Sequence, residues 1–371
     1  MPTSTAFDEV LKEKLWLRQS TGLLRELITA DTDFIDFCSN DYLGYARLAE
    51  LQPATHAMNG ATGSRLVSGN TTAIEQTEAL VAHYHGGQAA LIFNNGYAAN
   101  IGLLSSIAQR GDTIIIDELA HASIIDGARL SLAQHYKFKH NDIEDLEKKI
   151  RLAKGTCFVV TESLFSMDGD MAPLQSIATL CAQHGALLIV DEAHATGVYG
   201  SKGDGLVAEL ELQEQVFARV FTFGKALGLH GAAVVGSHTL RQYLINHARS
   251  FIYSTALPPH ASAQIATAYT LLPHADRAQL MALIAHFKTA IKQLSGYTFI
   301  DSHSPIQALI IGSNDVAKQL SAHLLNNGYF VKAILSPTVP VGTERLRICL
   351  HLHNTKTDID QLISHIQSFK A

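Results

Sequence analysis

Short apolar runs alternate with helical patterns through the middle of the chain. The runs are almost continuously apolar, as strands buried on both faces should be: Ala89–Phe93, Thr113–Ile116, Cys157–Thr161, Ala186–Val190, Val220–Phe223 and Ala232–Val235. Segments with helical periodicity separate most of them, for example residues 143–153 and 174–184, and are long enough for right-handed parallel crossovers. This pattern predicts a doubly wound, mainly parallel α/β sheet.

The last two runs break the pattern, because only a short segment lies between Val220–Phe223 and Ala232–Val235. A helical crossover does not fit there, so we expect one antiparallel strand in the parallel sheet.

Before the sheet, residues 1–35 predict a helical arm interrupted at Gly22. After it, shorter helices and strands predict a smaller α+β domain. The expected parts are an arm at 1–35, a large α/β domain at 36–270 and a C-terminal α+β domain at 271–371.

Composition narrows the classes of protein. Hydrophobic residues make up 47% of the 371 residues and the net charge is -6, so the chain predicts a globular protein that does not bind nucleic acid. The four cysteines lie far apart without CxxC spacing, so we expect reduced thiols and no metal site. No leader-like segment and no apolar run long enough for a membrane span occurs, which predicts a cytoplasmic protein without a membrane partner.

Polar and glycine residues follow several of the expected strands. Ligands of open α/β sheets bind at the carboxyl ends of the strands, so these residues should meet on one rim: Asn94–Tyr97, Asp117–His121, Thr161–Ser166, Asp191–His194 and Thr222–Lys225. Lys225 has no acid beside it in sequence, and a desolvated lysine is suited to form a Schiff base. Asp191 ends an apolar strand, where it either caps a helix or faces a cationic partner.

Other cofactors fit these residues poorly. The sequence Asp191-Glu192-Ala193-His194 mimics a helicase box, but the chain has neither a GxxxxGK[ST] loop nor a GxGxxG fingerprint. A lysine, an aspartate, a ring that can stack and a glycine-opened helix N-terminus are what pyridoxal 5'-phosphate (PLP) requires. PLP is therefore the expected cofactor.

A series of motifs resembles the α-oxoamine synthases, PLP-dependent enzymes of fold type I that condense an amino acid with an acyl thioester and release CO2. The motifs occur in order over nearly the whole chain: Phe37–Gly44, Gly63–Gly69, Ala120–Ser123, Phe165–Asp170, Asp191–Gly197, Thr222–Gly228, Ile252–Pro259, Pro337–Pro340 and Arg345–Arg347. The resemblance implies fold type I and a homodimer. Within the family, Phe223–Ala226, Tyr253–Pro259 and Pro337–Thr343 look most like the biotin-pathway member, which condenses L-alanine with a pimeloyl thioester.

The resemblance also implies roles for single residues. Lys225 would bind PLP covalently and move the Cα proton, Asp191 would pair with the pyridinium nitrogen, and His121 would stack on the ring. Residues implied around the rest of PLP are Ser166 and His194 at the phenolic oxygen, Asn95, Gly96, Tyr97 and Thr222 at the phosphate, and Ser254 and Thr255 from a second subunit. For the substrates, the resemblance implies Arg347 and Asn40 at the carboxylate and Arg25 and Thr338 at the acyl group.

The sequence departs from the motifs of the biotin-pathway enzyme at two places, and several alternative functions stay open. Leu335-Ser336 stand where the biotin-pathway enzyme usually has an arginine, which leaves the acyl contacts undecided, and Asn95 replaces a small hydroxyl residue. The donor is either pimeloyl-CoA or pimeloyl-acyl carrier protein. Alternatives are a sister enzyme that uses glycine with acetyl-CoA or succinyl-CoA, or serine with a long acyl thioester. Two further alternatives are a non-catalytic partner subunit and a plain aminotransferase of the same fold.

Overall fold

A computed structural model of the chain describes residues 4–25, 27, 34–53 and 58–370. Its central sheet has seven strands in the order β2-β8-β7-β6-β5-β3-β4. The strands are β2 (Ala89–Phe93), β3 (Thr113–Asp117), β4 (Gln134–Phe138), β5 (Cys157–Glu162), β6 (Leu187–Asp191), β7 (Val216–Thr222) and β8 (Ala232–Gly236). Strand β8 runs antiparallel to both β2 and β7, and every other pair is parallel. The expected sheet and its single antiparallel strand are confirmed.

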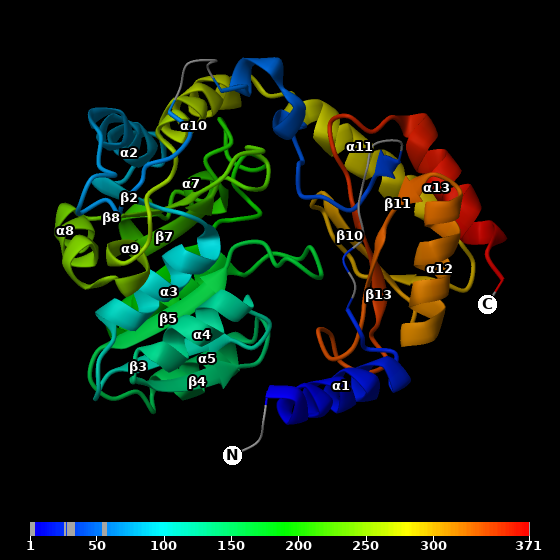
Figure 1. Ribbon diagram of the computed structural model, residues 1–371, viewed down its shortest axis with the longest axis horizontal. Coiled ribbons are helices and arrows are strands. Elements are labelled where there is room, and N and C mark those ends of the chain that lie inside the picture. Colours follow the sequence, from blue (N-terminus) through cyan, green and yellow to red (C-terminus); the bar gives the residue numbers. More distant parts are fainter. Residues whose placement is uncertain (1–3, 26, 28–33, 54–57, 371) are drawn as a thin grey trace.

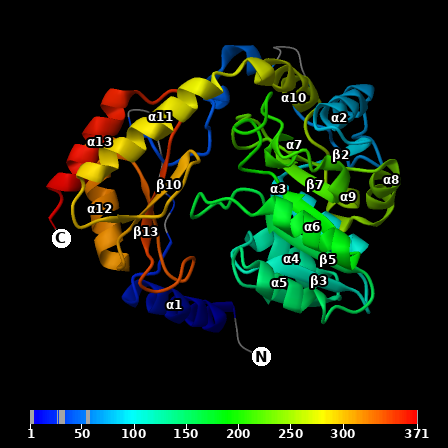
Figure 2. The ribbon, with the colours of Figure 1, turned by 180° about the vertical axis from the view of Figure 1, so that it is seen from behind.

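Helices cover both faces of this sheet. In Figure 1, α3 (Gly96–Ile107) and α4 (Ala122–Leu130) lie in front of the strands, and Figure 2 shows α6 (Leu174–His184) on the opposite face. Successive strand residues enter different cores: Val159 packs in the cluster with α6, while Val160 packs in the cluster with α3 and α4. Burying such an aliphatic side chain contributes roughly 1.5–3 kcal/mol, which explains why the inner strands carry apolar residues on both faces instead of alternating with polar ones.

The sequence pattern missed strand β4. Its residues are largely exposed and only Phe138 is buried, because β4 is an edge strand next to β3 alone. The remaining helices of the large domain are α2 (Thr72–Tyr84), α5 (Ile143–Ile150), α7 (Leu206–Glu209), α8 (His238–His247), α9 (Arg249–Ile252) and α10 (Pro259–Leu271). The expected helix at 143–153 is thus a turn shorter at its C-terminal end.

The C-terminal region forms its own layer of helices on a sheet (Figure 1). The antiparallel sheet has the order β12-β13-β10-β9, with β9 (Thr298–Phe299), β10 (Ile306–Ile310), β12 (Lys332–Ile334) and β13 (Arg345–Cys349). The helices are α11 (Arg277–Ala290), α12 (Asn314–Asn326) and α13 (Lys356–Ser368). A capping box between Thr355 and Asp358 fixes the start of α13. The expected α+β texture is present here.

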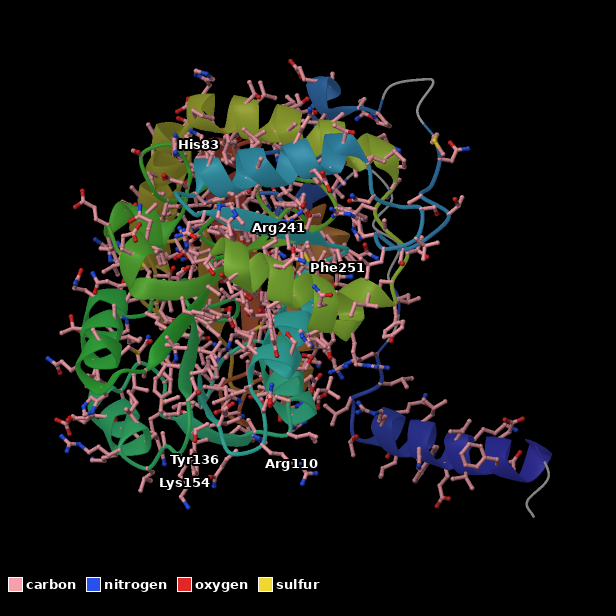
Figure 3. The ribbon with its side chains drawn as sticks, turned by 90° about the vertical axis from the view of Figure 1, so that its left-hand side faces the viewer. His83, Arg110, Tyr136, Lys154, Arg241 and Phe251 are labelled. Carbon is pink, nitrogen blue, oxygen red and sulfur yellow. The ribbon has the colours of Figure 1, made fainter. Side chains whose placement is uncertain are left out.

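The chain that follows the N-terminal arm joins the C-terminal region before it enters the large domain. Strand β1 (Ile35–Asp36) pairs in parallel with β11 (Tyr329–Phe330), and the Cys349 N–H donates to the carbonyl oxygen of Phe37 at 2.8 Å. Helix α1 (Ser4–Ser20) projects away from the body of the molecule, as Figure 3 shows, and leaves Trp16 66% exposed. In the described ranges, no helix is long and apolar enough to cross a membrane.

Candidate active site

A cavity of about 230 Å³ opens at the carboxyl ends of the parallel strands. Each of the strand-end segments expected on the rim contributes to its wall, together with several residues that the sequence did not single out. The lining residues are Asn40, Asn95, Gly96, Tyr97, Asn100, His121, Ser123, Glu162, Asp191, Ala193, Thr222, Gly224, Lys225, His230 and Gly231. The rim expected from the strand ends therefore exists as one cavity.

Lys225 lies in the turn after β7, partly buried in this wall. Burial lowers the pKa of the Lys225 amine to about 8, against the opposing attraction of the Asp191 and Glu162 carboxylates. Roughly a tenth of the amine is thus unprotonated at pH 7, far more than for an ordinary lysine, and the unprotonated form is the one that acts as a nucleophile or a proton acceptor.

Asp191 ends β6 and is held from two sides. Its Oδ1 accepts from the Ala193 N–H at 2.9 Å, and its Oδ2 accepts from Asn100 Nδ2 at 2.8 Å. Asn100 lies on α3 and also donates to Ser123 Oγ at 3.0 Å. The side chain therefore makes a local turn contact, as the capping interpretation expected, and still faces the cavity as a fixed carboxylate.

Glu162 is a buried carboxyl group at the end of β5 that the sequence analysis did not single out. The strand register places it directly beside Asp191, and its Oε1 accepts from the backbone N–H of His121 at 2.6 Å. Burial and the Asp191 carboxylate raise the pKa of Glu162 to about 8. Its place at the end of an apolar strand put it in the expected rim segment Thr161–Ser166, although no role was predicted for it.

His121 caps α4, where its Nδ1 accepts from the Ser123 N–H at 3.2 Å. The ring is exposed and lines the cavity, so one face is available for stacking. Burial of its surroundings and Lys225 lower the pKa of His121, although Asp191 opposes this, so the ring is neutral near pH 7.

The N-terminus of α3 offers donors to an anion. Asn95 caps this helix by accepting from the Ala98 N–H at 2.8 Å, while the N–H groups of Gly96 and Tyr97 have no partner in the described ranges. The buried hydroxyl of Thr222 likewise has no hydrogen-bond partner there. A Cβ on Gly96 would lie 2.5 Å from Thr222 Cγ2, so only glycine lets the helix start this close to β7. These unpaired donors fit a phosphate group.

A chain of hydrogen bonds forms a second group of site residues. Tyr42 Oη lies 2.7 Å from His194 Nδ1 and 3.1 Å from Asn40 Oδ1. Arg347 on β13 donates to Asn40 Oδ1 at 2.9 Å through Nη2, and to the carbonyl oxygen of Ser166 at 2.5 Å through Nε. The structure thus brings together four expected residues and adds Tyr42, which the sequence analysis did not assign.

Other expected residues lie outside the cavity wall. Ser254 and Thr255 do not line the cavity of their own chain, but the Thr255 carbonyl accepts from Asn94, two residues before Gly96, at 2.7 Å. The side chain of Tyr97 hydrogen bonds to Asp126. Arg25 and Thr338 are exposed and away from the lining residues, so their contact with an acyl substrate stays a prediction.

One group of potential metal ligands occurs elsewhere in the described ranges. Ligand atoms of Asp36, His351 and His353 lie within 4.8 Å of one another. Both ring nitrogens of His351 already face oxygen atoms, with Nδ1 3.0 Å from Asn354 Oδ1 and Nε2 3.0 Å from the carbonyl of Ser39. These contacts join the segment after β1 to the end of β13.

Comparisons with known proteins agree with this geometry. Residues 32–366 match the family model described as aminotransferase class I and II. The 8-amino-7-oxononanoate synthase of Marinobacter nauticus is 42% identical over 355 residues, covering 93% of this chain and 90% of that protein.

Solved structures show the same fold. A serine palmitoyltransferase from Sphingomonas wittichii superposes with a TM-score of 0.91 and 30% identity, covering 99% of this chain and 98% of that one. An 8-amino-7-oxononanoate synthase from Francisella tularensis gives a TM-score of 0.79 and 30% identity, over 91% of this chain and 98% of that one. The chain is therefore an enzyme that belongs to the class I and II aminotransferase family, in the branch of the 8-amino-7-oxononanoate synthases.

Proposed function

We propose that this enzyme condenses L-alanine with a pimeloyl thioester to give 8-amino-7-oxononanoate, CO2 and a free thiol in biotin biosynthesis, with PLP as its cofactor. One observation supports this proposal above the others. A lysine with a lowered pKa, a fixed aspartate and a set of unpaired phosphate donors line a single cavity. The relatives named above supply the substrate class.

The residues present fit PLP. The Gly96 and Tyr97 N–H groups and the Thr222 hydroxyl would hold its phosphate, Asp191 its pyridinium nitrogen, and Lys225 its aldehyde carbon by covalent attachment. When bound, PLP supplies an electron sink that weakens bonds to the α-carbon of an amino acid. Asp191 supports that role because a carboxylate beside a pyridinium favours the charged form of both groups.

The chain's own groups account for binding and proton movement. The Lys225 amine, with a pKa near neutrality, takes a proton from the amino acid and returns it later. The Arg347 guanidinium is buried and oriented by Asn40 and Ser166, which prepares it to bind the alanine carboxylate in a bidentate manner. Holding both substrates at one site would supply rate through proximity.

A homodimer belongs to this proposal. Ser254 and Thr255 follow α9 beside the phosphate-binding turn, with Asn94 Nδ2 bound to the Thr255 carbonyl, yet they do not face their own cavity. Tyr253 is 71% exposed next to them. We propose that Ser254 and Thr255 reach the phosphate of the second subunit. Whether the acyl donor is the coenzyme A or the carrier-protein thioester is decided by the experiment below.

The decisive experiment measures thiol release by the PLP-loaded enzyme. L-alanine with pimeloyl-CoA is compared with L-alanine with pimeloyl-acyl carrier protein, and with glycine plus acetyl-CoA or succinyl-CoA. We expect release that depends on alanine and a pimeloyl donor, and its loss in Lys225→Ala. Thiol release with glycine and a short acyl-CoA but not with alanine, or product formation without thiol release, contradicts the proposed substrates.

A second candidate is condensation of serine with a long acyl thioester. It is favoured by the backbone similarity to the Sphingomonas wittichii serine palmitoyltransferase, whose TM-score of 0.91 exceeds the 0.79 of the Francisella tularensis synthase. The same assay with serine and palmitoyl-CoA separates the two. Faster thiol release from serine than from alanine establishes the second candidate instead.

A further inference from the structure

Tyr42 and His194 form a buried pair beside the cavity. Tyr42 has no exposed surface and His194 is 3% exposed. Tyr42 comes from the segment after β1 and His194 from the turn after β6, so tertiary packing alone brings them to 2.7 Å. Burial, Lys225 and Arg347 hold the pKa of His194 well below its ordinary value, so its ring carries a single proton. Which nitrogen bears that proton decides whether the other nitrogen donates or accepts.

The surroundings of the Tyr42 hydroxyl favour one arrangement. Burial raises the pKa of Tyr42, so the hydroxyl keeps its proton throughout the working pH range. It has two possible acceptors, His194 Nδ1 at 2.7 Å and Asn40 Oδ1 at 3.1 Å. Asn40 Oδ1 already accepts from the Arg347 guanidinium at 2.9 Å, whereas His194 Nδ1 has Tyr42 as its only partner in the described ranges. The Tyr42 hydroxyl therefore donates its proton to His194 Nδ1, which has no other hydrogen-bond donor among the described residues.

A second buried tyrosine–histidine pair in the same chain has a hydrogen bond of the same direction, with the tyrosine hydroxyl as the donor. Tyr269 Oη lies 2.9 Å from His85 Nε2, and His85 Nδ1 lies 3.1 Å from the carbonyl oxygen of Asp204. A carbonyl only accepts, so His85 Nδ1 carries the proton and Tyr269 donates to Nε2. Neither residue lines the cavity. The Asp204 carbonyl sets the His85 tautomer, and a buried tyrosine thus donates to a histidine nitrogen away from the cavity.

We propose that Tyr42 is a positioning residue that donates its proton to His194 Nδ1 and thereby fixes His194 as the Nε2–H tautomer. Among the described residues the His194 ring makes one hydrogen bond, through Nδ1, so Nε2 is available as a donor. This inference rests on the proposed function for its consequence, since the acceptor would be the phenolic oxygen of PLP. A donor there stabilises the oxygen in its ionised form. Without Tyr42, Nδ1 keeps the proton in part of the molecules and Nε2 then offers only a lone pair.

The direct test reads the tautomer and needs no cofactor. The full-length chain is labelled with ¹⁵N-histidine and examined by long-range ¹H–¹⁵N correlation, with His194 identified by its loss in His194→Gln. We expect the His194 proton on Nε2 in the wild-type chain and a mixed or reversed tautomer in Tyr42→Phe. A wild-type His194 protonated on Nδ1, or an unchanged tautomer in Tyr42→Phe, overturns the proposal. Because the wild-type spectrum alone can overturn it, failure of the variant to fold leaves the test intact.

A second measurement follows the consequence in the PLP-loaded enzyme. Loss of the donor should raise the pH at which the visible absorption of the bound cofactor changes, by about one unit. Tyr269→Phe is the matched control, since it removes an equally buried hydroxyl from a histidine, and it should leave that pH unchanged. If the pH of the absorption change moves as much in Tyr269→Phe as in Tyr42→Phe, the effect comes from the lost stability of the chain and not from His194. That result overturns the proposal.

The two readouts separate this inference from the proposed function. If the chain binds no PLP, the absorption experiment gives no signal and the proposed function fails, while the ¹⁵N spectra still decide the tautomer. If Tyr42→Phe raises the KM for alanine and leaves both the tautomer and the absorption midpoint unchanged, the hydroxyl acts through Asn40 and Arg347. That result refutes the role assigned here.

Discussion

The active site has two sides that are built in different ways. One is the cavity wall at the ends of the strands, called the sheet wall; the other, called the second wall, is the group of Arg347, Asn40 and Tyr42, of which only Asn40 lines the cavity. Asp191 and Glu162 end neighbouring strands and are paired by the register of the central sheet, and Lys225 lies in the turn after the adjacent strand β7. Arg347, Asn40 and Tyr42 come from β13 and the segment after β1, and side-chain hydrogen bonds hold them against the large domain. A sheet register is maintained by many backbone bonds, whereas each of these side-chain contacts stands nearly alone.

This difference separates chemistry from substrate binding. In the proposed function, the sheet wall moves protons and holds the cofactor, so the loss of a charge there should chiefly lower kcat. The second wall would bind the substrate carboxylate through its guanidinium, and the loop at residues 163–171 reaches it from the large domain, seen in green in Figure 1. An ion pair between Asp168 and Arg345 joins the same loop to β13. Mutations there should chiefly raise KM.

The largest effect is expected from Asp191→Asn. The amide keeps the shape of the side chain and can accept from either Asn100 or the Ala193 N–H but not from both, and it removes the charge that supports a pyridinium. We expect kcat for thiol release to fall on the order of 10²–10³-fold, the scale for losing one preorganised charge. Thermal unfolding should show a loss of about 1–3 kcal/mol, because one buried donor loses its acceptor, with the fold retained. A kcat within a few-fold of normal would show that the sheet wall does not carry this chemistry.

Arg347→Lys tests the second wall. Lysine keeps the positive charge but loses the planar fork that contacts Asn40 and Ser166 and would bind a carboxylate with two bonds. We expect the KM for alanine to rise about 10- to 100-fold, since hydrogen bonds to charged groups contribute about 1.5–3 kcal/mol, with a smaller change in kcat. The control is Arg345→Lys, two residues away on the same strand and paired with Asp168. Equal KM values for wild type and Arg347→Lys would contradict the assignment.

The same division explains what the sequence could predict. Apolar runs followed by polar residues located the sheet wall, because the carboxyl ends of parallel strands always meet on one edge. Strand β4 was missed since its edge position leaves it exposed. Tyr42 was missed for another reason: its partner lies 152 residues away, and a tyrosine in a turn carries no periodic signal. The likeness to a known family, not the hydrophobic pattern, supplied Arg347 and Asn40.

Gly96→Ala probes how tightly the sheet wall is packed. The added methyl group would lie 2.5 Å from Thr222 Cγ2, so either the helix start or β7 must move. Overpacking of this kind costs about 1–3 kcal/mol, and we expect the Kd for PLP to rise about 10-fold or more. Gly185→Ala, at a glycine with open space around it, is a control for stability although its backbone conformation is left-handed. Unchanged PLP affinity would place the phosphate elsewhere.

The smallest effect concerns pH and the Lys225 amine. With a pKa of about 8, roughly a tenth of this amine is unprotonated at pH 7 and most of it above pH 9. The rate at which the PLP-free enzyme attaches PLP covalently should therefore rise through a midpoint near pH 8. Measuring the rate relative to Nα-acetyl-lysine in the same buffers removes the titration of PLP itself. A midpoint above pH 10 would mean that Lys225 is an ordinary exposed lysine.

Glu162→Gln sharpens this measurement. The ionised Glu162 carboxylate raises the pKa of Lys225, so its removal should move the midpoint to lower pH by less than about one unit. Glu192→Gln is the matched control: Glu192 is also buried and has a pKa raised to about 7, but its carboxylate bonds to the Val207 N–H away from the cavity. A midpoint that moves upward in Glu162→Gln, or moves equally in both variants, would show that the strand register does not couple the charges of the sheet wall.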